Sequence, residues 1–480
     1  MSNTLKALVW SFLEQSGSKI ILLLVQIVLA RILSPDAFGI LAILLVVTQI
    51  ADSVAQSGLG MALIQKTDSS NTSYSTGLWL SLSIALVLYS LIFISAPVIA
   101  EFYQMPDLVD YLRILGLIVI VNSANSIQRS YYQRMMSFKA IFKATTISAV
   151  VSGAIGIVLA ITGFGVWSLI AQSLLQSMFT CLIMLFQGGW MPSFVFDMGE
   201  AKHLFSYGWK ICITGILNVL YSGVSELIIG RSCSVSDLGI YSQGRKYPQA
   251  AIGVLGNSIA NVLFPFLSAI KKDSAALKTK IKEALLLGSF IIVPISFLFA
   301  VIAEPLIVLL LTDKWLSCVP IFQLACLSNS VLILQLVNLR TYMALGNSAL
   351  YLKLQIIKVL IGGGMICGTA YFTHDIYATA VATFLSGTLS VFAVDLIPAK
   401  RMHGYGALSQ LHDVFKFYLL SAISSVVTIS IDFLNVSYLL KLLLQCVVFI
   451  SIYLLGAKIF HFEELERGIG LIKGLFERSR

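Results

Sequence analysis

The feature that most constrains this chain is a succession of apolar segments, each near 20 residues, separated by short polar turns. A helix that crosses the hydrocarbon core of a bilayer needs about 20 mainly apolar residues. A transmembrane barrel would instead show strands of about ten residues with alternating polarity, whereas these apolar runs are continuous. The pattern therefore predicts an all-α integral membrane protein.

Fourteen segments of the chain fit this description, and the connections between them are too short to hold a soluble domain. The predicted spans are 10–32, 38–60, 77–100, 108–128, 142–162, 165–187, 206–230, 247–269, 284–311, 320–345, 350–372, 375–397, 415–431 and 437–457. Only 11% of the 480 residues are charged, against about 25% in an ordinary soluble domain. Lipid is therefore the expected solvent for most of the surface.

One polar turn occurs twice in the chain, and it predicts an internal duplication. "ARILSPDAFGI" occupies residues 30–40 and "GRSCSVSDLGI" occupies residues 230–240, with Arg, Ser, Gly and Ile at matching places. Because six predicted spans separate the turns, both lie on the same side of the membrane. Spans 1–6 and 7–12 are then two copies related by a pseudo-two-fold axis along the membrane normal. Coincidence is the alternative, since a tight turn needs Gly and Ser in any case.

The duplication predicts how the chain is divided. We expect an N-terminal six-helix lobe over 1–200, a C-terminal six-helix lobe over 201–400, and two additional helices with a cytoplasmic tail over 401–480. Each lobe would present its first helices to a central interface. Rocking of one lobe against the other would expose that interface to alternate sides of the membrane, which is alternating access.

The distribution of basic residues predicts the orientation in the membrane. If the N-terminus is inside, about 21 Lys and Arg side chains fall in inner segments and 6 in outer ones. Basic residues are retained on the cytoplasmic side, so both termini are expected there. The net charge of +9 is then explained by orientation and by anionic lipid headgroups, and we expect no nucleic-acid partner.

Ionisable side chains inside the predicted spans are the expected functional groups, because a charge in lipid is costly unless it faces a cavity or a partner. The bases that we expect to form a cationic, substrate-binding cavity are Lys19, Arg113, Lys210, Arg340 and Lys358. The polar residues expected to line it at helical intervals are Gln15, Gln26, Asp52, Gln56, Thr214, Asn218, Tyr221, Asn257 and Asn261. A positive, wet cleft of this kind suits a lipid carrier with a pyrophosphate head and a sugar chain.

Structural roles for the same side chains stay open. Arg113 has Asp107 and Asp110 nearby for a surface ion pair. Lys19 and Arg340 lie near span ends, where a long side chain reaches the interface. Lys358 is deeper and would then neutralise an acid that the pattern does not identify, while Asp395 is expected at the membrane interface.

Three stretches resemble the polysaccharide transporter family, the O-antigen and exopolysaccharide flippases of the multidrug, oligosaccharidyl-lipid and polysaccharide exporter superfamily. They are "LARILSPDAFGILAILLVVTQIADSVAQSGLGMALIQ" (29–65), "YYQRMMSFK" (131–139) and "GFGVWSLIAQ" (163–172). The resemblance implies a two-lobed exporter of lipid-linked oligosaccharides for lipopolysaccharide, capsule or exopolysaccharide synthesis, with polysaccharide polymerase machinery as a partner. Relatives commonly use an ion gradient, so Asp52 and Glu226 are the expected Na⁺ or H⁺ sites, with a structural ion pair as the alternative.

Three other functions compete with the flippase. A cation-coupled drug or metabolite antiporter of the same superfamily would need acidic cavity residues, whereas bases prevail here. A membrane-embedded glycan polymerase or ligase would need a positioned acid, base or nucleophile, commonly on a long outer loop, and the outer loops are short. A scaffold in an envelope complex would move no substrate. We therefore expect no enzymatic activity, no catalytic residue and no cofactor. The histidines lack metal-ligand spacing, so we expect no metal site, and the lack of a Walker loop argues against ATP-driven transport by this chain alone.

Overall fold

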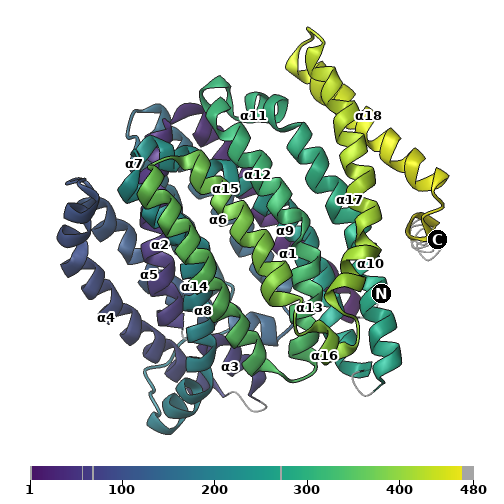
Figure 1. Cartoon of the computed structure of the whole chain (residues 1–480). Coiled ribbons are helices and arrows are strands. Elements are labelled where there is room, and N and C mark those ends of the chain that lie inside the picture. Colours follow the sequence, from purple (N-terminus) through teal and green to yellow (C-terminus); the bar gives the residue numbers. More distant parts are fainter. Residues whose placement is uncertain (1–2, 57, 67–69, 271–272, 467–480) are drawn as a thin grey trace. The chain divides into compact units, whose positions relative to one another are not determined.

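The structure is a computed structural model of the whole chain, shown in Figure 1. It describes residues 3–56, 58–66, 70–270 and 273–466; within these ranges the side chains of 3–16 and of several residues near 210, 260 and 274 lie outside the description. The described part of the chain consists of helices joined by turns, and it contains no strand. The predicted all-α class is confirmed.

The chain forms two compact units, residues 1–239 and 240–480. The helices of the N-terminal unit are α1 (Asn3–Ile32), α2 (Pro35–Gln56), α3 (Leu59–Gln65), α4 (Asn71–Tyr103), α5 (Leu108–Arg134), α6 (Phe138–Ile161), α7 (Val166–Phe186) and α8 (Met198–Ser232), with the start of α9 (Val235–Ile270). In this unit α6 packs against α1 and α7, α5 against α4 and α7, and α2 against α5 and α8. The neighbouring pair α4 and α5 is visible in Figure 1.

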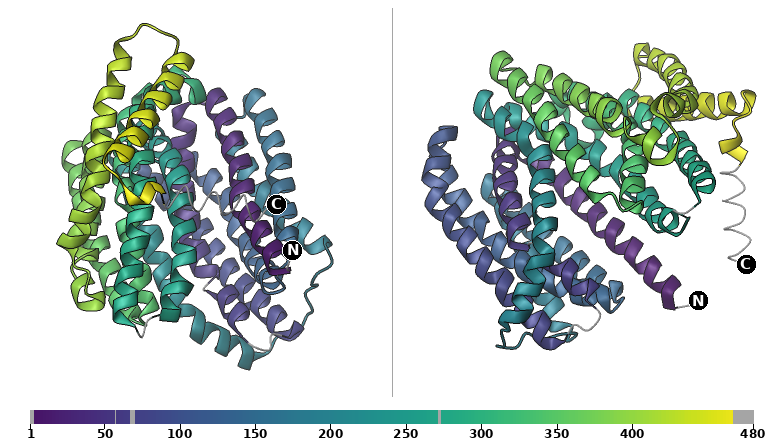
Figure 2. Two further views of the ribbon diagram at one scale, coloured as in Figure 1. Left: turned by 90° about the vertical axis from the view of Figure 1, so that its right-hand side faces the viewer. Right: turned by 60° about the horizontal axis from the view of Figure 1, so that its bottom comes forward.

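The C-terminal unit holds the remainder of α9 and the rest of the helices. These are α10 (Ser274–Val301), α11 (Ala303–Leu311), η1 (Asp313–Cys318), α12 (Val319–Ser330), α13 (Leu332–Ala344), α14 (Ser348–Thr373), α15 (Ile376–Ser390), η2 (Val391–Asp395), α16 (Ala399–His403), α17 (Ala407–Ile429), η3 (Ser430–Phe433) and α18 (Tyr438–Ile459). Helix α10 packs against α12 and α17, and α17 packs against α18. Figure 2 shows α17 and α18 side by side in yellow-green and yellow. Ile292, Phe417 and Phe449 are buried in the shared core of α10, α17 and α18.

The lengths of these helices confirm a protein with many membrane spans. Within the described residues, eleven helices are long and apolar enough to cross a bilayer, or twelve if the bent pair Asp313–Ser330 and Leu332–Ala344 is one span. The predicted segments 10–32 and 247–269 lie on α1 and α9, outside that set, so the count of fourteen stays a prediction. The division into lobes at 200 and 400 likewise stays a prediction.

The two copies of the repeated turn contact each other within the N-terminal unit. Gly39 and Gly239 are both buried near the starts of α2 and α9. A Cβ atom on Gly39 would lie 2.0 Å from the carbonyl oxygen of Val235, and one on Gly239 would lie 1.9 Å from that of Pro35. Pro35 and Val235 hold matching places in the turns, so the contact is reciprocal. Only glycine lets the backbones approach this closely, and steric contact therefore explains why both turns carry it.

Candidate functional site

A polar cavity lies inside the N-terminal unit, between α2, α5, α6 and α7, and its volume is about 270 Å³. The residues that line it are Gln56, Asn122, Asn125, Ser126, Arg129, Ile141, Thr145, Gln176, Ser177, Thr180 and Met184. Most of them carry amide or hydroxyl groups, and Arg129 carries a positive charge. Polar side chains of a membrane protein must face protein or water and not lipid. A cavity inside the unit is therefore where such side chains are expected.

A second cavity, of about 370 Å³, adjoins the first and is bordered by α2, α3, α5 and α8. The two cavities share Gln56, Ser126 and Arg129. Helix α2 ends at Gln56, and Gly58 takes a left-handed φ of 64° before α3 begins. The chain can turn here beside the cavity because glycine has no Cβ atom to clash in the left-handed conformation. Arg129 therefore borders both cavities.

Helix α5 positions the charged side chain of this site. Asn122, Ser126, Arg129 and Gln133 recur at intervals of four, three and four residues, which places them on one face of a helix. All four line one cavity or the other. The predicted span ends at residue 128, whereas in the structure α5 continues to Arg134, so Arg129 lies on the helix and not in a connection. Its position on the inner side of the membrane stays a prediction.

Two helical stripes in the sequence would have revealed this site. The first is the α5 stripe of Asn122, Ser126, Arg129 and Gln133. The second runs along α7 through Gln172 and Gln176 to Thr180, again at intervals of four. Gln172 donates to Oε1 of Gln176 over 3.3 Å and accepts from Gln26 of α1 over 3.2 Å. Of these three amides, Gln26 was predicted to line a cavity, whereas Gln172 and Gln176 were not predicted.

Asp52, a residue that the sequence analysis selected, lies next to this lining. Asn122 Nδ2 donates to Asp52 Oδ2 over 2.8 Å. The other carboxylate oxygen, Oδ1, is buried and accepts no hydrogen bond from the described residues, and the same holds for Oδ1 of Asn125. Buried polar atoms are normally paired, so these oxygens mark where the unit's own hydrogen bonding is incomplete.

The chemistry that these residues offer is recognition of a polar anion. A guanidinium has five N–H donors in a planar fork that matches phosphate or carboxylate oxygens. The surrounding amides and hydroxyls both donate and accept, as sugar hydroxyls require. Within the described residues no group of three or more His, Cys, Asp or Glu side chains could hold a metal ion.

Lys358 is enclosed within the C-terminal unit together with Asp395. Lys358 Nζ lies 3.1 Å from Asp395 Oδ2, and the two side chains are 1% and 0% exposed. Gln335 donates to the same carboxylate oxygen over 3.2 Å, and Tyr342 donates to the Asp395 carbonyl oxygen over 2.7 Å. Lys358 therefore neutralises an acid, which is one of the two roles predicted for it. Asp395 lies in the core of the protein, whereas it was predicted at the membrane interface.

The other predicted bases lie apart from the cavities described above. Arg113 stacks over the ring of Phe93 at 4.2 Å instead of pairing with an acid. Lys19 is exposed on α1, and Arg340 is half-buried on α13. The side chains of Gln15, Lys210, Asn257 and Asn261 lie outside the described residues. Binding of substrate by Lys19, Arg113, Lys210, Arg340 and Lys358 stays a prediction.

The polar residues predicted on α8 belong to the N-terminal unit. Thr214 and Tyr221 are half-buried, Asn218 is exposed, and Glu226 is half-buried. Cys212 and Gly215 lie within one helical turn of Thr214, and both line the second cavity. This part of α8 therefore borders the site, although the predicted residues themselves are not among its lining.

The apolar helices and the polar interior together define a multi-span membrane protein. A profile described as polysaccharide biosynthesis protein matches residues 28–320, more than half of the chain. The chain belongs to this polysaccharide biosynthesis protein family, which confirms the resemblance found in the first turn.

Curated relatives agree with the family. The chain is 27% identical over 324 residues to the succinoglycan biosynthesis transport protein ExoT of Rhizobium meliloti, a match that covers 67% of this chain and 65% of the relative. It is 26% identical to the teichuronic acid biosynthesis protein TuaB of Bacillus subtilis, with 63% of each covered. It is 24% identical to the lipopolysaccharide biosynthesis protein WzxC of Escherichia coli, with 62% and 61% covered. The chain thus spans slightly less than two thirds of these relatives.

Solved structures share the fold. The lipid II flippase MurJ in its inward closed conformation matches with a TM-score of 0.76 and 16% identity, over 95% of this chain and 100% of that one. An inward-facing multidrug resistance MATE family transporter of the MOP superfamily matches with a TM-score of 0.62 and 13% identity, over 83% and 94%. These matches confirm the predicted all-α membrane fold.

Proposed function

We propose that this chain is a flippase that moves polyprenyl-pyrophosphate-linked oligosaccharides across a bacterial inner membrane by alternating access. The products would serve lipopolysaccharide, capsule or exopolysaccharide synthesis. The observation that carries the proposal is the polar cavity around Arg129, inside one unit of a helix bundle that belongs to a polysaccharide biosynthesis family. A drug efflux function finds less support, because the charged residue in the lining is a base.

The proposed roles follow from the chemistry of each group. The Arg129 guanidinium would bind a pyrophosphate oxygen or another anionic group of the headgroup. The amides of Gln56, Asn122 and Asn125 would exchange hydrogen bonds with sugar hydroxyls. The polyprenyl tail would stay among lipids, where it needs no polar partner.

Flipping in proteoliposomes tests the proposal. Purified protein would be reconstituted with a fluorescent lipid-linked oligosaccharide, and a membrane-impermeant quencher would report the fraction moved. Arg129→Gln should slow the initial rate by about tenfold or more, since a hydrogen bond to a charged group contributes about 1.5–3 kcal/mol. Arg129→Lys should keep part of the rate, because it retains the charge without the fork.

Arg231→Gln is the matched control. Arg231 is exposed at the end of α8, with its guanidinium 5.5 Å from the ring centre of Phe102, and it lines neither cavity. This variant should flip at the wild-type rate. An unchanged rate in Arg129→Gln, or no flipping by the wild-type protein, would count against the proposal.

Ion coupling at Asp52 is part of the proposal. The buried Oδ1 atom, which accepts no hydrogen bond from the described residues, is a plausible ligand for H⁺ or Na⁺ because carboxylate oxygens bind both. Asp52→Asn keeps the shape and removes the charge. It should abolish the dependence of flipping on an imposed ion gradient, while leaving slow downhill movement. Gradient dependence that survives this substitution would transfer the role to Glu226 or to another group.

The orientation and the partners are also proposed. The basic residues support cytoplasmic termini, which proteolysis of a C-terminal tag in right-side-out and inverted vesicles would check. Association with polysaccharide polymerase machinery follows from the shared substrate. Co-purification of the polymerase with the tagged chain from the native membrane is the corresponding measurement.

A further inference from the structure

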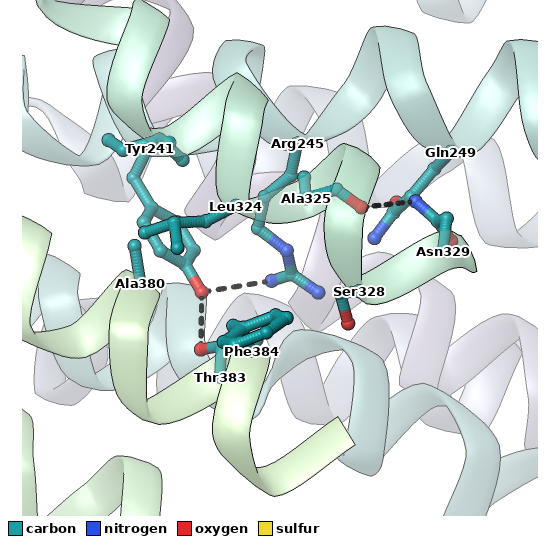
Figure 3. A pocket seen from close by; sticks show the side chains of 11 residues that line it. Tyr241, Arg245, Gln249, Leu324, Ala325, Ser328, Asn329, Ala380, Thr383 and Phe384 are labelled. Carbon is teal, nitrogen blue, oxygen red and sulfur yellow. Dashed lines mark hydrogen bonds between the residues drawn. The ribbon is translucent and has the colours of Figure 1, made fainter. Parts of the chain in front are cut away.

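Two polar pockets of different size lie among the described residues of the C-terminal unit. The smaller one lies between α9, α12 and α15, and Figure 3 shows Arg245 in it, donating to the Tyr241 hydroxyl over 3.3 Å. Its volume of about 60 Å³ leaves room for a few water molecules. The larger one, of about 470 Å³, lies where α10 and α17 begin. Ligand sites in proteins occupy about 300–1,000 Å³, so the larger pocket has the size of a ligand site.

The positive charges of the larger pocket come from two lysines of α10. Lys278 and Lys282 both line it, both are exposed, and their spacing of four residues places them on one face of the helix. Lys282 Nζ lies 2.8 Å from Asp413 Oδ2, and the Tyr405 hydroxyl donates to the same oxygen over 2.6 Å. Asp413 therefore holds Lys282 at the pocket. With two lysines against one carboxylate the lining is positive, and His412, which also lines it, adds to this charge when protonated.

The first turn of α17 forms the opposite side of the larger pocket. The first N–H groups of an α-helix have no acceptor within the helix, and the residue before this helix, Gly406, provides no side-chain hydrogen bond to them. Ser409 adds a hydroxyl to the lining from the same turn. An anion that is held by the two lysines would therefore also gain from the N–H groups and the dipole of α17.

An exposed apolar face of α17 continues from the larger pocket. Leu408, which lines the pocket, is 84% exposed, and Phe415 and Leu419 are 61% and 51% exposed. Their intervals of seven and four residues place all three on one face of the helix. This face runs along a helix that is long and apolar enough to cross a bilayer. A ligand with a phosphate and an acyl chain would fit both the pocket and this face, whereas a free phosphate would use the pocket alone.

We propose that the pocket at the starts of α10 and α17 binds the phosphate of an anionic phospholipid, with an acyl chain along the exposed face of α17. Lys278 and Lys282 contact the phosphate oxygens as point charges, and the Ser409 hydroxyl donates to one of them. Basic pockets between membrane helices bind lipid headgroups in the same way. The site lies outside the Arg129 cavities and does not depend on the proposed function.

Native mass spectrometry of the full-length protein in detergent tests the site by counting bound lipid. Phosphatidylglycerol would be titrated into the protein, and phosphatidylcholine with the same acyl chains would be titrated in parallel. The wild type should retain one phosphatidylglycerol molecule and should bind phosphatidylcholine about tenfold more weakly, because the choline group cancels the phosphate charge. Lys278→Gln should weaken binding of phosphatidylglycerol about tenfold, since it removes a hydrogen bond from a charged donor.

Lys280→Gln is the matched control, because it changes the same residue type on the same helix. Lys280 pairs with Glu283 at 2.7 Å and does not line the pocket. This variant should bind phosphatidylglycerol as the wild type does. Lys278→Arg should retain most of the binding, since it keeps the charge. Its binding would show that a loss in Lys278→Gln does not come from misfolding.

Two further ligands identify the source of the phosphate. Glycerol 3-phosphate carries the charge without acyl chains and should bind at least about tenfold more weakly than phosphatidylglycerol. A polyprenyl pyrophosphate at equal concentration should leave the bound phosphatidylglycerol in place.

Four results would each overturn the proposal. They are equal binding of phosphatidylcholine, wild-type affinity in Lys278→Gln, glycerol 3-phosphate that binds as tightly as the lipid, and displacement of the lipid by the polyprenyl pyrophosphate. None of these measurements involves transport, so failure of the flippase function would leave their result unchanged.

Discussion

The polar interiors of the two units contrast with each other. In the N-terminal unit the amides and hydroxyls around Arg129 face two cavities, and buried oxygens of Asp52 and Asn125 accept no hydrogen bond from described residues. In the C-terminal unit, Lys358 closes on Asp395, and Asn338 exchanges hydrogen bonds with Gln410. The same residue types thus line cavities around Arg129 in one unit and form direct side-chain pairs between helices in the other, although Asp395 Oδ1 also accepts no hydrogen bond from the described residues.

The contrast teaches how to separate ligand sites from structural groups in an apolar bundle. A buried polar group without a partner costs free energy, so closed groups stabilise the fold and open ones are retained for another reason. Substitutions of closed groups should therefore lower stability, and substitutions of open groups should lower transport. Each of the following experiments tests one side of this distinction.

The largest loss of stability is expected when the buried ion pair is broken from one side. Asp395→Leu should lower the free energy of unfolding by about 3–5 kcal/mol, because it leaves the Lys358 ammonium buried without its counter-charge. The double variant Lys358→Met with Asp395→Leu should regain most of this loss. Unfolding in detergent, followed by tryptophan fluorescence, measures both. Additive losses would show that the side chains act independently.

The amide pair of the C-terminal unit should contribute less. Asn338 Nδ2 donates to Gln410 Oε1 over 2.8 Å, and Gln410 Nε2 donates back to Asn338 Oδ1 over 3.1 Å. Asn338→Leu should destabilise by about 1–3 kcal/mol, since it leaves the Gln410 amide unsatisfied. The pair Asn338→Leu with Gln410→Leu should cost less than the sum of the single changes in the same unfolding assay. If the double variant lost as much stability as the two single variants together, the amides of Asn338 and Gln410 would not be interacting.

A pH dependence should arise from His403, which is buried beside this pair with Nε2 3.2 Å from Asn338 Oδ1. Burial lowers its pKa from the ordinary 6.5 to about 4. Between these values the unfolded chain binds a proton that the folded chain does not. Stability should therefore fall as the pH drops from 6.5 towards 4, by up to about 1.4 kcal/mol per pH unit.

The measurement is the unfolding free energy of wild type and His403→Gln across this pH range. The variant should lose the His403 contribution to the slope, whereas His412→Gln, at a residue with a 90% exposed side chain, should keep it. Equal slopes in wild type and His403→Gln would mean that His403 binds its proton equally in both states.

The smallest effect on stability is expected at Arg129, because its side chain borders the two cavities of the N-terminal unit. Arg129→Gln should change the unfolding free energy by no more than about 0.5 kcal/mol, although it should slow flipping about tenfold. The unfolding assay and the proteoliposome assay on one protein batch measure both. A large loss of stability would place Arg129 with the closed groups and remove the contrast between the units.

Most of the helices could be predicted from the sequence because apolar length alone determines them. The predicted spans 165–187 and 437–457 nearly coincide with α7 and α18. Breaks inside helices were missed, such as the one at Gly58 and the π-helical turn that ends α15 at Asp395, because they depend on local backbone geometry.

The site was less predictable than the fold. The apolar run of the predicted span 108–128 ends just before Arg129, although the helix continues to Arg134. The partner of Lys358 is 37 positions away on another helix, and no periodicity along one helix reveals such a pairing.

The mutual contact of Gly39 and Gly239 limits how the halves of this gene can be exchanged. Each glycine makes room for a carbonyl group from the other copy of the turn, so neither position can accept a larger residue independently of the other. A chimera that takes one turn from a relative with a bulkier residue would force the retained backbone away. Recombination between family members should therefore succeed only when both turns come from the same parent.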